Sequence, residues 1–105
     1  MKPLVRRVHA DEDVRAAIDH YLEQDALDVA GSFVDELERA YEHIQRHPAT
    51  GSGRYAHELN LPGLRFRPLR RYPFLVFYME GRDAIEVWRA LHSSRDIPAW
   101  LECEE

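Results

Sequence analysis

The sequence feature that most constrains the fold is an uninterrupted apolar run, FLVFYM, over residues 74–79. The run is aromatic and β-branched and too short for a typical helix, which favours a strand covered on both faces. Gly81, Arg82 and Asp83 follow, and glycine and aspartate suit a tight turn. Residues 84–92 are again rich in strand-forming residues. The two segments therefore predict an antiparallel hairpin at the centre of a sheet.

Two stretches with helical spacing precede this hairpin. Apolar residues at positions 14, 17, 18, 21 and 22 form one stripe, and Asp11 is placed to cap a helix over residues 12–24. A second stripe begins after Asp25, its expected cap, and ends before Pro48, because the residue before a proline is disfavoured in a helix. Since almost no linker separates the two helices, they are predicted to form an antiparallel αα-hairpin over the sheet.

Shorter segments complete the predicted fold. Residues 4–8 are expected to form an N-terminal strand, and residues 64–67 a strand that Pro68 confines to an edge or a bulge. Residues 55–61 fit either a loop or a helical turn, and residues 96–101 fit a last short helix capped by its first residue. The order predicts one α+β domain over all 105 residues: an N-terminal strand, an αα-hairpin, a three-stranded antiparallel meander and a short C-terminal helix.

The net charge of −5 conceals a segregation along the chain. Residues 1–53 carry six Lys or Arg against eleven Asp or Glu, whereas residues 54–95 carry eight Arg against four acids. Residues 96–105 add four acids and no base. The basic charge therefore falls on the predicted sheet. It forms either an ordinary solvated face or a cationic surface for an acidic partner or nucleic acid.

Composition bears on location and chemistry. The single cysteine, Cys103, cannot form an intrachain disulfide, which favours a reducing cytosol. The N-terminus shows no signal peptide, and no apolar run is long enough to span a membrane, so a cytoplasmic protein is predicted. The sequence has no glycine-rich phosphate loop, nucleophile elbow or metal-ligand spacing. We therefore predict no catalytic residue, no metal and no cofactor.

Five segments, in the same order along the chain, carry a resemblance to a known family. They are FVDEL at 33–37, HPATG at 47–51, LNLPGLR at 59–65, YPFLVFY at 72–78 and VWRALH at 87–92, the last followed by Arg95, Asp96 and Ile97. Together they cover nearly the whole chain. The pattern resembles the RelE/ParE superfamily of bacterial type II toxins, and within it the ParE branch.

The resemblance implies a toxin that is neutralised by an antitoxin encoded beside it, here a ParD-like protein of the ribbon-helix-helix type. It implies that the C-terminal segment of the antitoxin lies in a groove between the helix pair and the sheet. ParE-like toxins act on DNA gyrase, without a catalytic centre of their own. By this resemblance the end of the chain, including His92, Arg95 and Trp100, is expected to face gyrase.

The arginines of the predicted sheet are the candidates for antitoxin binding, because they could accept acidic side chains of the antitoxin. They are Arg65, Arg67, Arg70, Arg71 and Arg89. Arg65, Arg67 and Arg71 are separated by even numbers of residues, so on one regular strand they would lie on the same face. Pro68 could interrupt that alternation. Arg89 shares parity with apolar residues of its own strand, so it is either ion-paired or on an open face that binds a partner.

RelE-like toxins, which cut messenger RNA on the ribosome, provide the alternative. Such cleavage requires a base, an acid and cationic groups, for which His92, Arg89, Arg71 and Arg65 are the candidates. RelE-like enzymes usually carry an arginine where this chain has Leu75, and an aromatic hydroxyl near the C-terminus, where this chain has only tryptophan. Arg89 and His92 are three apart on a strand and are expected on opposite faces. A degenerate member that only binds partners is a third hypothesis.

Overall fold

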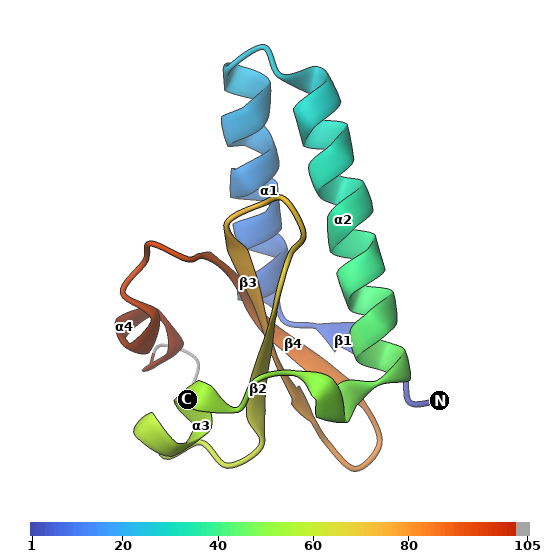
Figure 1. Ribbon diagram of the computed structural model, residues 1–105, viewed down its shortest axis with the longest axis vertical. Helices are drawn as coiled ribbons and strands as arrows, with labels where there is room; N and C mark the ends of the chain where they lie inside the picture. Colours follow the sequence, from blue (N-terminus) through green and yellow to red (C-terminus); the bar gives the residue numbers. More distant parts are fainter. Residues whose placement is uncertain (103–105) are drawn as a thin grey trace.

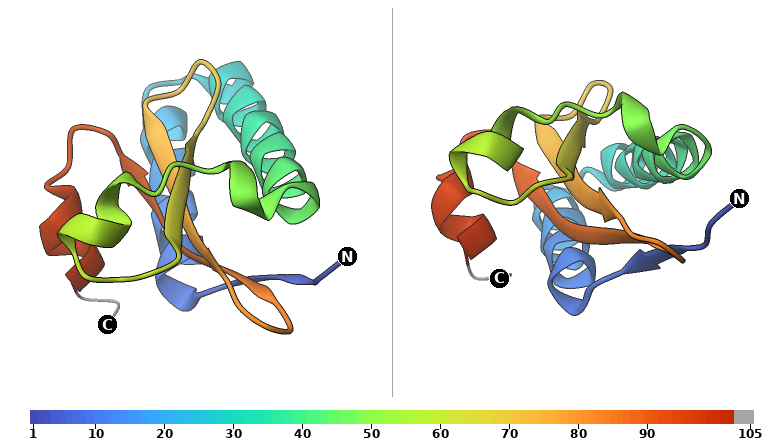
Figure 2. Two further views of the ribbon diagram at one scale, coloured as in Figure 1. Left: turned by 60° about the horizontal axis from the view of Figure 1, so that its bottom comes forward. Right: turned by 90° about the horizontal axis from the view of Figure 1, so that it is seen from below.

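The computed structural model describes residues 1–102, so the expectations for Cys103 and the last acidic residues lie outside it. A sheet lies between two layers of helices (Figures 1 and 2). In chain order the elements are β1 (Leu4–Arg6), α1 (Val8–Glu23), α2 (Leu27–Arg46), the 3₁₀ helix η1 (Pro48–Thr50), α3 (Arg54–Glu58), β2 (Leu64–Pro68), β3 (Phe74–Glu80), β4 (Ile85–His92) and α4 (Ile97–Glu102). The predicted α+β class is confirmed.

The sheet has the strand order β1-β4-β3-β2, so the predicted hairpin β3–β4 lies at its centre. The meander β2–β3–β4 is antiparallel, as predicted. The N-terminal strand β1, however, pairs with β4 in parallel, so the sheet is mixed and not purely antiparallel. A parallel neighbour requires a long crossover, and the helix pair lies within the connection from β1 back to the sheet. The alternation of residues along a strand does not reveal this pairing.

The helix pair α1–α2 covers one face of the sheet (Figure 1). Phe33 of α2 is fully buried and meets Tyr72 and Phe74 edge-on, at ring-centroid distances of 5.5 and 5.2 Å. The predicted stripes supply this core, except that Leu22 is exposed. The chain's own side chains fill the space between the helices and the sheet. Whether an antitoxin segment binds between the helix pair and the sheet stays a prediction.

The other face of the sheet is covered by α3 and α4 (Figure 2). Phe77 and Leu64 are buried in this second core, together with Ile97 and Leu101 of α4. Residues 55–61, for which the sequence left two interpretations open, contribute Tyr55 to this core, and the helical turn α3 begins one residue earlier, at Arg54. The apolar run of β3 is therefore covered on both sides, as its composition predicted.

The predicted helix starts are wrong. α1 begins at Val8 rather than Glu12, and Asp11 lies in its first turn, where it pairs with Arg6 at 2.9 Å instead of capping. α2 begins at Leu27, and Asp25 lies in the preceding turn with a φ of +54°. Neither helix start has a side-chain cap, because the tertiary core fixes both positions.

Gly51 provides a test of the packing at the end of α2. The Tyr78 hydroxyl accepts a hydrogen bond from Gly51 N–H (3.0 Å) and donates one to Pro48 O (2.8 Å). A Cβ at position 51 would overlap this hydroxyl. We expect Gly51→Ala to lower the free energy of unfolding by about 1–3 kcal/mol in urea denaturation. The control is Gly31→Ala, in an open position on α2, which should raise it by about 0.5–1 kcal/mol. Equal effects would contradict this packing.

Tyr41 makes stability depend on alkaline pH. Its hydroxyl is buried and has no hydrogen-bond partner within residues 1–102. Burial raises the pKa of Tyr41 to about 12, opposed by Arg6 and assisted by Asp11 and Asp13. The unfolded tyrosine titrates near about pH 10, so the folded state holds this proton more tightly. The resulting stability is complete below about pH 10 and is lost as pH rises towards about 12.

We expect Tyr41→Phe to be at least as stable as the wild type at about pH 8, because the variant lacks the unpaired hydroxyl. At about pH 11 its advantage should grow by roughly 1 kcal/mol, because only the wild type must keep this proton. Urea denaturation of both proteins across this range is the measurement. Identical pH dependence of the two would contradict the prediction.

Candidate functional site

A β-bulge in β4 determines where its polar side chains lie. Phe77 of β3 pairs with Arg89, but the next residue, Tyr78, pairs with Val87, so Trp88 is an additional residue on β4. The bulge reverses the alternation along the strand. Val87 therefore belongs to the core under the helix pair, whereas Leu91 belongs to the core under α3 and α4. Simple alternation predicted that Arg89 lies on the same face of the sheet as the apolar residues two positions away on either side. This prediction is wrong, because the bulge places Val87 and Leu91 on opposite faces.

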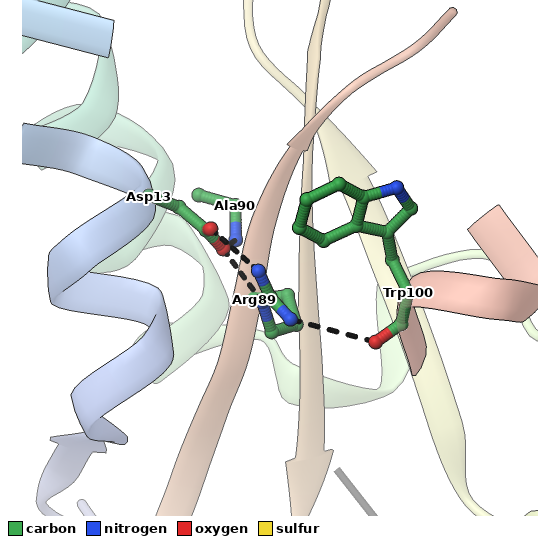
Figure 3. A network of polar contacts seen from close by, with 4 residues as sticks. All are labelled: Asp13, Arg89, Ala90 and Trp100. Atoms are coloured by element: carbon green, nitrogen blue, oxygen red, sulfur yellow. Dashed lines mark hydrogen bonds and ion pairs between the residues drawn. The ribbon is translucent and has the colours of Figure 1, made fainter. Parts of the chain in front are cut away.

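Arg89 is held by Asp13 of α1 (Figure 3). Its Nε and Nη2 donate to the two carboxylate oxygens at 2.8 and 2.7 Å, which is a bidentate pair. Asp13 also accepts the backbone N–H of Ala90 (3.0 Å), and Arg89 Nη1 lies 3.4 Å from Trp100 O. The side chains are only 7% and 13% exposed, respectively for Arg89 and Asp13. The network joins α1, β4 and α4.

A cleft of about 780 Å³ opens beside this network at the C-terminal end of β4. Its lining comes from α1 on one side and from α4 with the preceding loop on the other. The charged and polar residues in it are Glu12, Asp13, His20, Arg89, His92, Ser94 and Arg95. The three residues predicted to face gyrase, His92, Arg95 and Trp100, all line this one cleft. Whether they contact gyrase stays a prediction.

The hydrogen bonds of His92 define its neutral tautomer. Its Nδ1 accepts the backbone N–H of Ser94 at 3.1 Å and lies 2.7 Å from the Ser94 hydroxyl. A backbone N–H can only donate, so Nδ1 carries no proton, and the neutral ring is protonated at Nε2. The ring also packs edge-on against Phe74, with centroids 5.3 Å apart. Arg89 pairs with Phe77 and His92 pairs with Phe74, and these two partners belong to the cores on opposite faces of the sheet. The two residues therefore lie on opposite faces, as expected, although both line the cleft at the end of β4.

Arg95 and Trp100 form a cation–π stack at the edge of the cleft. The Arg95 guanidinium lies 4.5 Å from the centroid of Trp100, and Arg89 lies 5.1 Å from the same ring. Trp100 is half-buried and Arg95 is exposed. Stacking with cations orients the indole ring and restrains Arg95 without neutralising it.

The predicted basic surface is only partly present. Arg65 and Arg67 share parity on β2 and are half-buried, and Arg65 Nη1 donates to Gly51 O at 2.9 Å. Arg70 and Arg71 are exposed in the loop between β2 and β3, where Arg71 has a φ of +68° and leaves the strand pattern. Arg89 is 6% exposed and ion-paired. Of the two alternatives that the sequence left open for Arg89, the ion pair is the one observed, so Arg89 does not belong to an exposed basic surface.

Sequence reasoning missed four polar residues of the cleft: Glu12, Asp13, His20 and Ser94. The signal that could have identified Asp13 is Arg89, because a buried guanidinium in a strand requires a carboxylate from another element. Within residues 1–102, no cluster of three or more His, Cys, Asp or Glu could hold a metal, and no helix has the length and apolar character to cross a membrane.

A family profile and a solved structure together identify the class as toxins of type II toxin-antitoxin systems. A chain described as "Chromosomal ParDE TA system from P. aeruginosa" matches with a TM-score of 0.73 and 25% sequence identity. The match covers 88% of this chain and 96% of that chain. The profile described as "ParE toxin of type II toxin-antitoxin system, parDE" matches residues 5–97, so the chain belongs to the ParE toxin family. Comparison with curated proteins found no match. The resemblance to the ParE branch is confirmed.

The buried ion pair generates a stability prediction with a matched control. Asp13→Asn leaves the Arg89 charge buried without a counter-charge, and we expect a loss of roughly 3 kcal/mol in free energy of unfolding. Asp11→Asn removes the exposed pair with Arg6, whose side chains are 48% and 52% exposed, and should cost no more than about 1 kcal/mol. Chemical denaturation of both variants provides the comparison. A loss for Asp13→Asn no larger than that for Asp11→Asn would show that the pair does not stabilise the fold.

Proposed function

We propose that this ParE-family chain is a cytoplasmic toxin that binds and poisons DNA gyrase and is neutralised by a ParD-like ribbon-helix-helix antitoxin. Family membership over residues 5–97 is the observation that carries this proposal. The solved ParDE structure supports a partner antitoxin for this chain as well.

The composition of the cleft supports recognition of a protein target. Asp13 neutralises Arg89, so the buried cation is satisfied within the chain. Arg95 and Trp100 remain at the edge, and arginine and tryptophan are the residue types that most often dominate binding energy at protein interfaces. The pair therefore forms a preorganised contact point for gyrase, in the region that the sequence resemblance assigned to it.

The ribonuclease alternative has one observation in its favour, because His20, His92 and Arg95 line a single cleft. The charges there argue against it. Glu12 and Asp13 balance Arg89 and Arg95, whereas cleavage of RNA requires an excess of cations around the phosphate. Nδ1 of His92 is already occupied by Ser94, and its Nε2 carries the proton in the neutral ring. A neutral His92 therefore has no free nitrogen to act as a general base.

The antitoxin is proposed to bind the outer surface of the toxin. The space beneath the helix pair is filled by Phe33 and its neighbours, so an inserted segment would have to displace the core. Of the five arginines predicted to bind the antitoxin, four remain accessible: Arg65, Arg67, Arg70 and Arg71. Acidic side chains of an antitoxin would complement them.

A supercoiling assay with purified protein and DNA gyrase tests the proposal. We expect inhibition by the wild type and a loss of potency of about tenfold or more for Arg95→Glu, because a reversed charge at a protein interface weakens association. Arg82→Glu is the matched control, since Arg82 is exposed in the turn at the opposite end of β4 and should leave potency unchanged. Primer extension on messenger RNA after induction measures cleavage in parallel.

The outcomes separate the hypotheses. Inhibited supercoiling with intact RNA supports the gyrase poison. RNA cleavage with unaffected gyrase would replace it with the ribonuclease, and neither activity would leave a binding module. Equal potency of Arg95→Glu and Arg82→Glu would remove the cleft from the gyrase contact.

A further inference from the structure

A second group of basic side chains lies outside the cleft lining, where the end of α2 meets the edge strand β2. It consists of His43, His47, Arg65 and Arg67, and we call it the α2–β2 basic cluster. The rings of His43 and His47 are stacked at an angle, with centroids 5.1 Å apart. Arg65 reaches over the chain after η1 to Gly51 O (2.9 Å). The sequence did not connect these histidines with the arginines, because they belong to different elements.

The hydrogen bonds of Thr50 define the proton on His43. The Thr50 hydroxyl donates its single proton to His47 O at 2.8 Å. Its 3.3 Å contact with Nε2 of His43 must therefore have the imidazole as the donor. Neutral His43 is protonated at Nε2, and a second proton would go to Nδ1. Protonation therefore adds a full positive charge without breaking the bond to Thr50.

The cluster has no carboxylate of its own. Within residues 1–102 no Asp or Glu forms an ion pair with any of its four members. On α2, Glu42 is paired with Arg46 at 2.9 Å. On β3, Glu80 is paired with Lys2 at 2.8 Å, and the other facing group is the hydroxyl of Tyr78. η1 contributes only backbone carbonyls and the Thr50 hydroxyl. The positive charge is therefore left for a ligand.

The pKa of His43 reflects this crowding. Partial burial lowers it first, and the positive charges of Arg67 and His47 lower it further. An anion placed on the cluster would reverse the second effect. By linkage, any group whose pKa rises on binding makes binding tighter as pH falls.

We infer that the α2–β2 basic cluster binds an acidic peptide segment and holds it more tightly when His43 and His47 are protonated. The inference rests on the proposed function, because it names the chemistry by which the antitoxin would be held on this face. An acidic peptide fits better than nucleic acid, because binding to a phosphate backbone typically uses more cations than the four here.

Poly-L-aspartate carrying a fluorescent label is the probe, and its anisotropy with the full chain is the measurement. Between about pH 7.5 and about pH 5.5 the probe stays ionised, because aspartate titrates near about pH 4. We expect affinity to rise by about tenfold over this range. The double variant His43→Gln/His47→Gln should lose this rise, whereas Arg67→Gln should bind more weakly at both pH values. His57→Gln, an exposed histidine on α3, is the matched control and should keep the full pH response.

NMR titration of the wild type tests the same inference without a variant. Adding poly-L-aspartate should raise the midpoint of the His43 imidazole titration. An unchanged midpoint, or a pH response that survives in the double variant, would overturn the inference. A single-stranded oligonucleotide that displaces the peptide and shows the same histidine dependence would also overturn it, in favour of nucleic acid. The supercoiling assay is independent of these readings, so failure of the gyrase proposal and failure of this inference give different results.

Discussion

The buried pair between Asp13 and Arg89 is the interaction on which the rest of the structure depends. A guanidinium inside a sheet loses its hydration, and only a bidentate carboxylate compensates for that loss. Because Asp13 also accepts Ala90 N–H, and Arg89 also approaches Trp100 O, one ion pair fixes α1, β4 and α4 together (Figure 3). The bulge at Trp88 makes this possible, because it places Arg89 and Val87 on opposite faces of the sheet. The cleft and its Arg95–Trp100 stack are consequences of this junction.

Burial of the β3–β4 hairpin on both faces explains where partners can bind. The helix pair occupies one face and α3 with α4 the other, so neither broad face of the sheet is open (Figure 2). The remaining binding surfaces are the ends and edges of the sheet. The cleft lies at the C-terminal end of β4, and the α2–β2 basic cluster lies beside the edge strand β2.

These two surfaces differ in their chemistry. In the cleft, Glu12 and Asp13 balance two arginines, and an aromatic stack supplies the contact area. In the α2–β2 basic cluster, four basic side chains have no carboxylate partner among residues 1–102. Under the proposed function, the target and the antitoxin would be bound at these two separate surfaces. The charge segregation along the chain, with its excess of arginine after residue 53, supplies the second surface together with the histidines of α2.

Much of the fold could be predicted from the sequence, because the spacing of apolar residues and the presence of turn-forming residues act over short stretches of chain. The apolar run of β3 determined a strand buried on both faces, and the stripe through Phe33, Leu37 and Ile44 determined a helix that ends before Pro48. Local patterns did not determine the helix starts, because packing overrode the expected aspartate caps. Tertiary structure alone decided that β1 runs parallel to β4, that a bulge redirects Arg89, and that Asp13 meets it across 76 positions of sequence. The sequence alone determined the residues available for recognition; their grouping into a cleft and a basic cluster depended on long-range contacts, which no local pattern encodes.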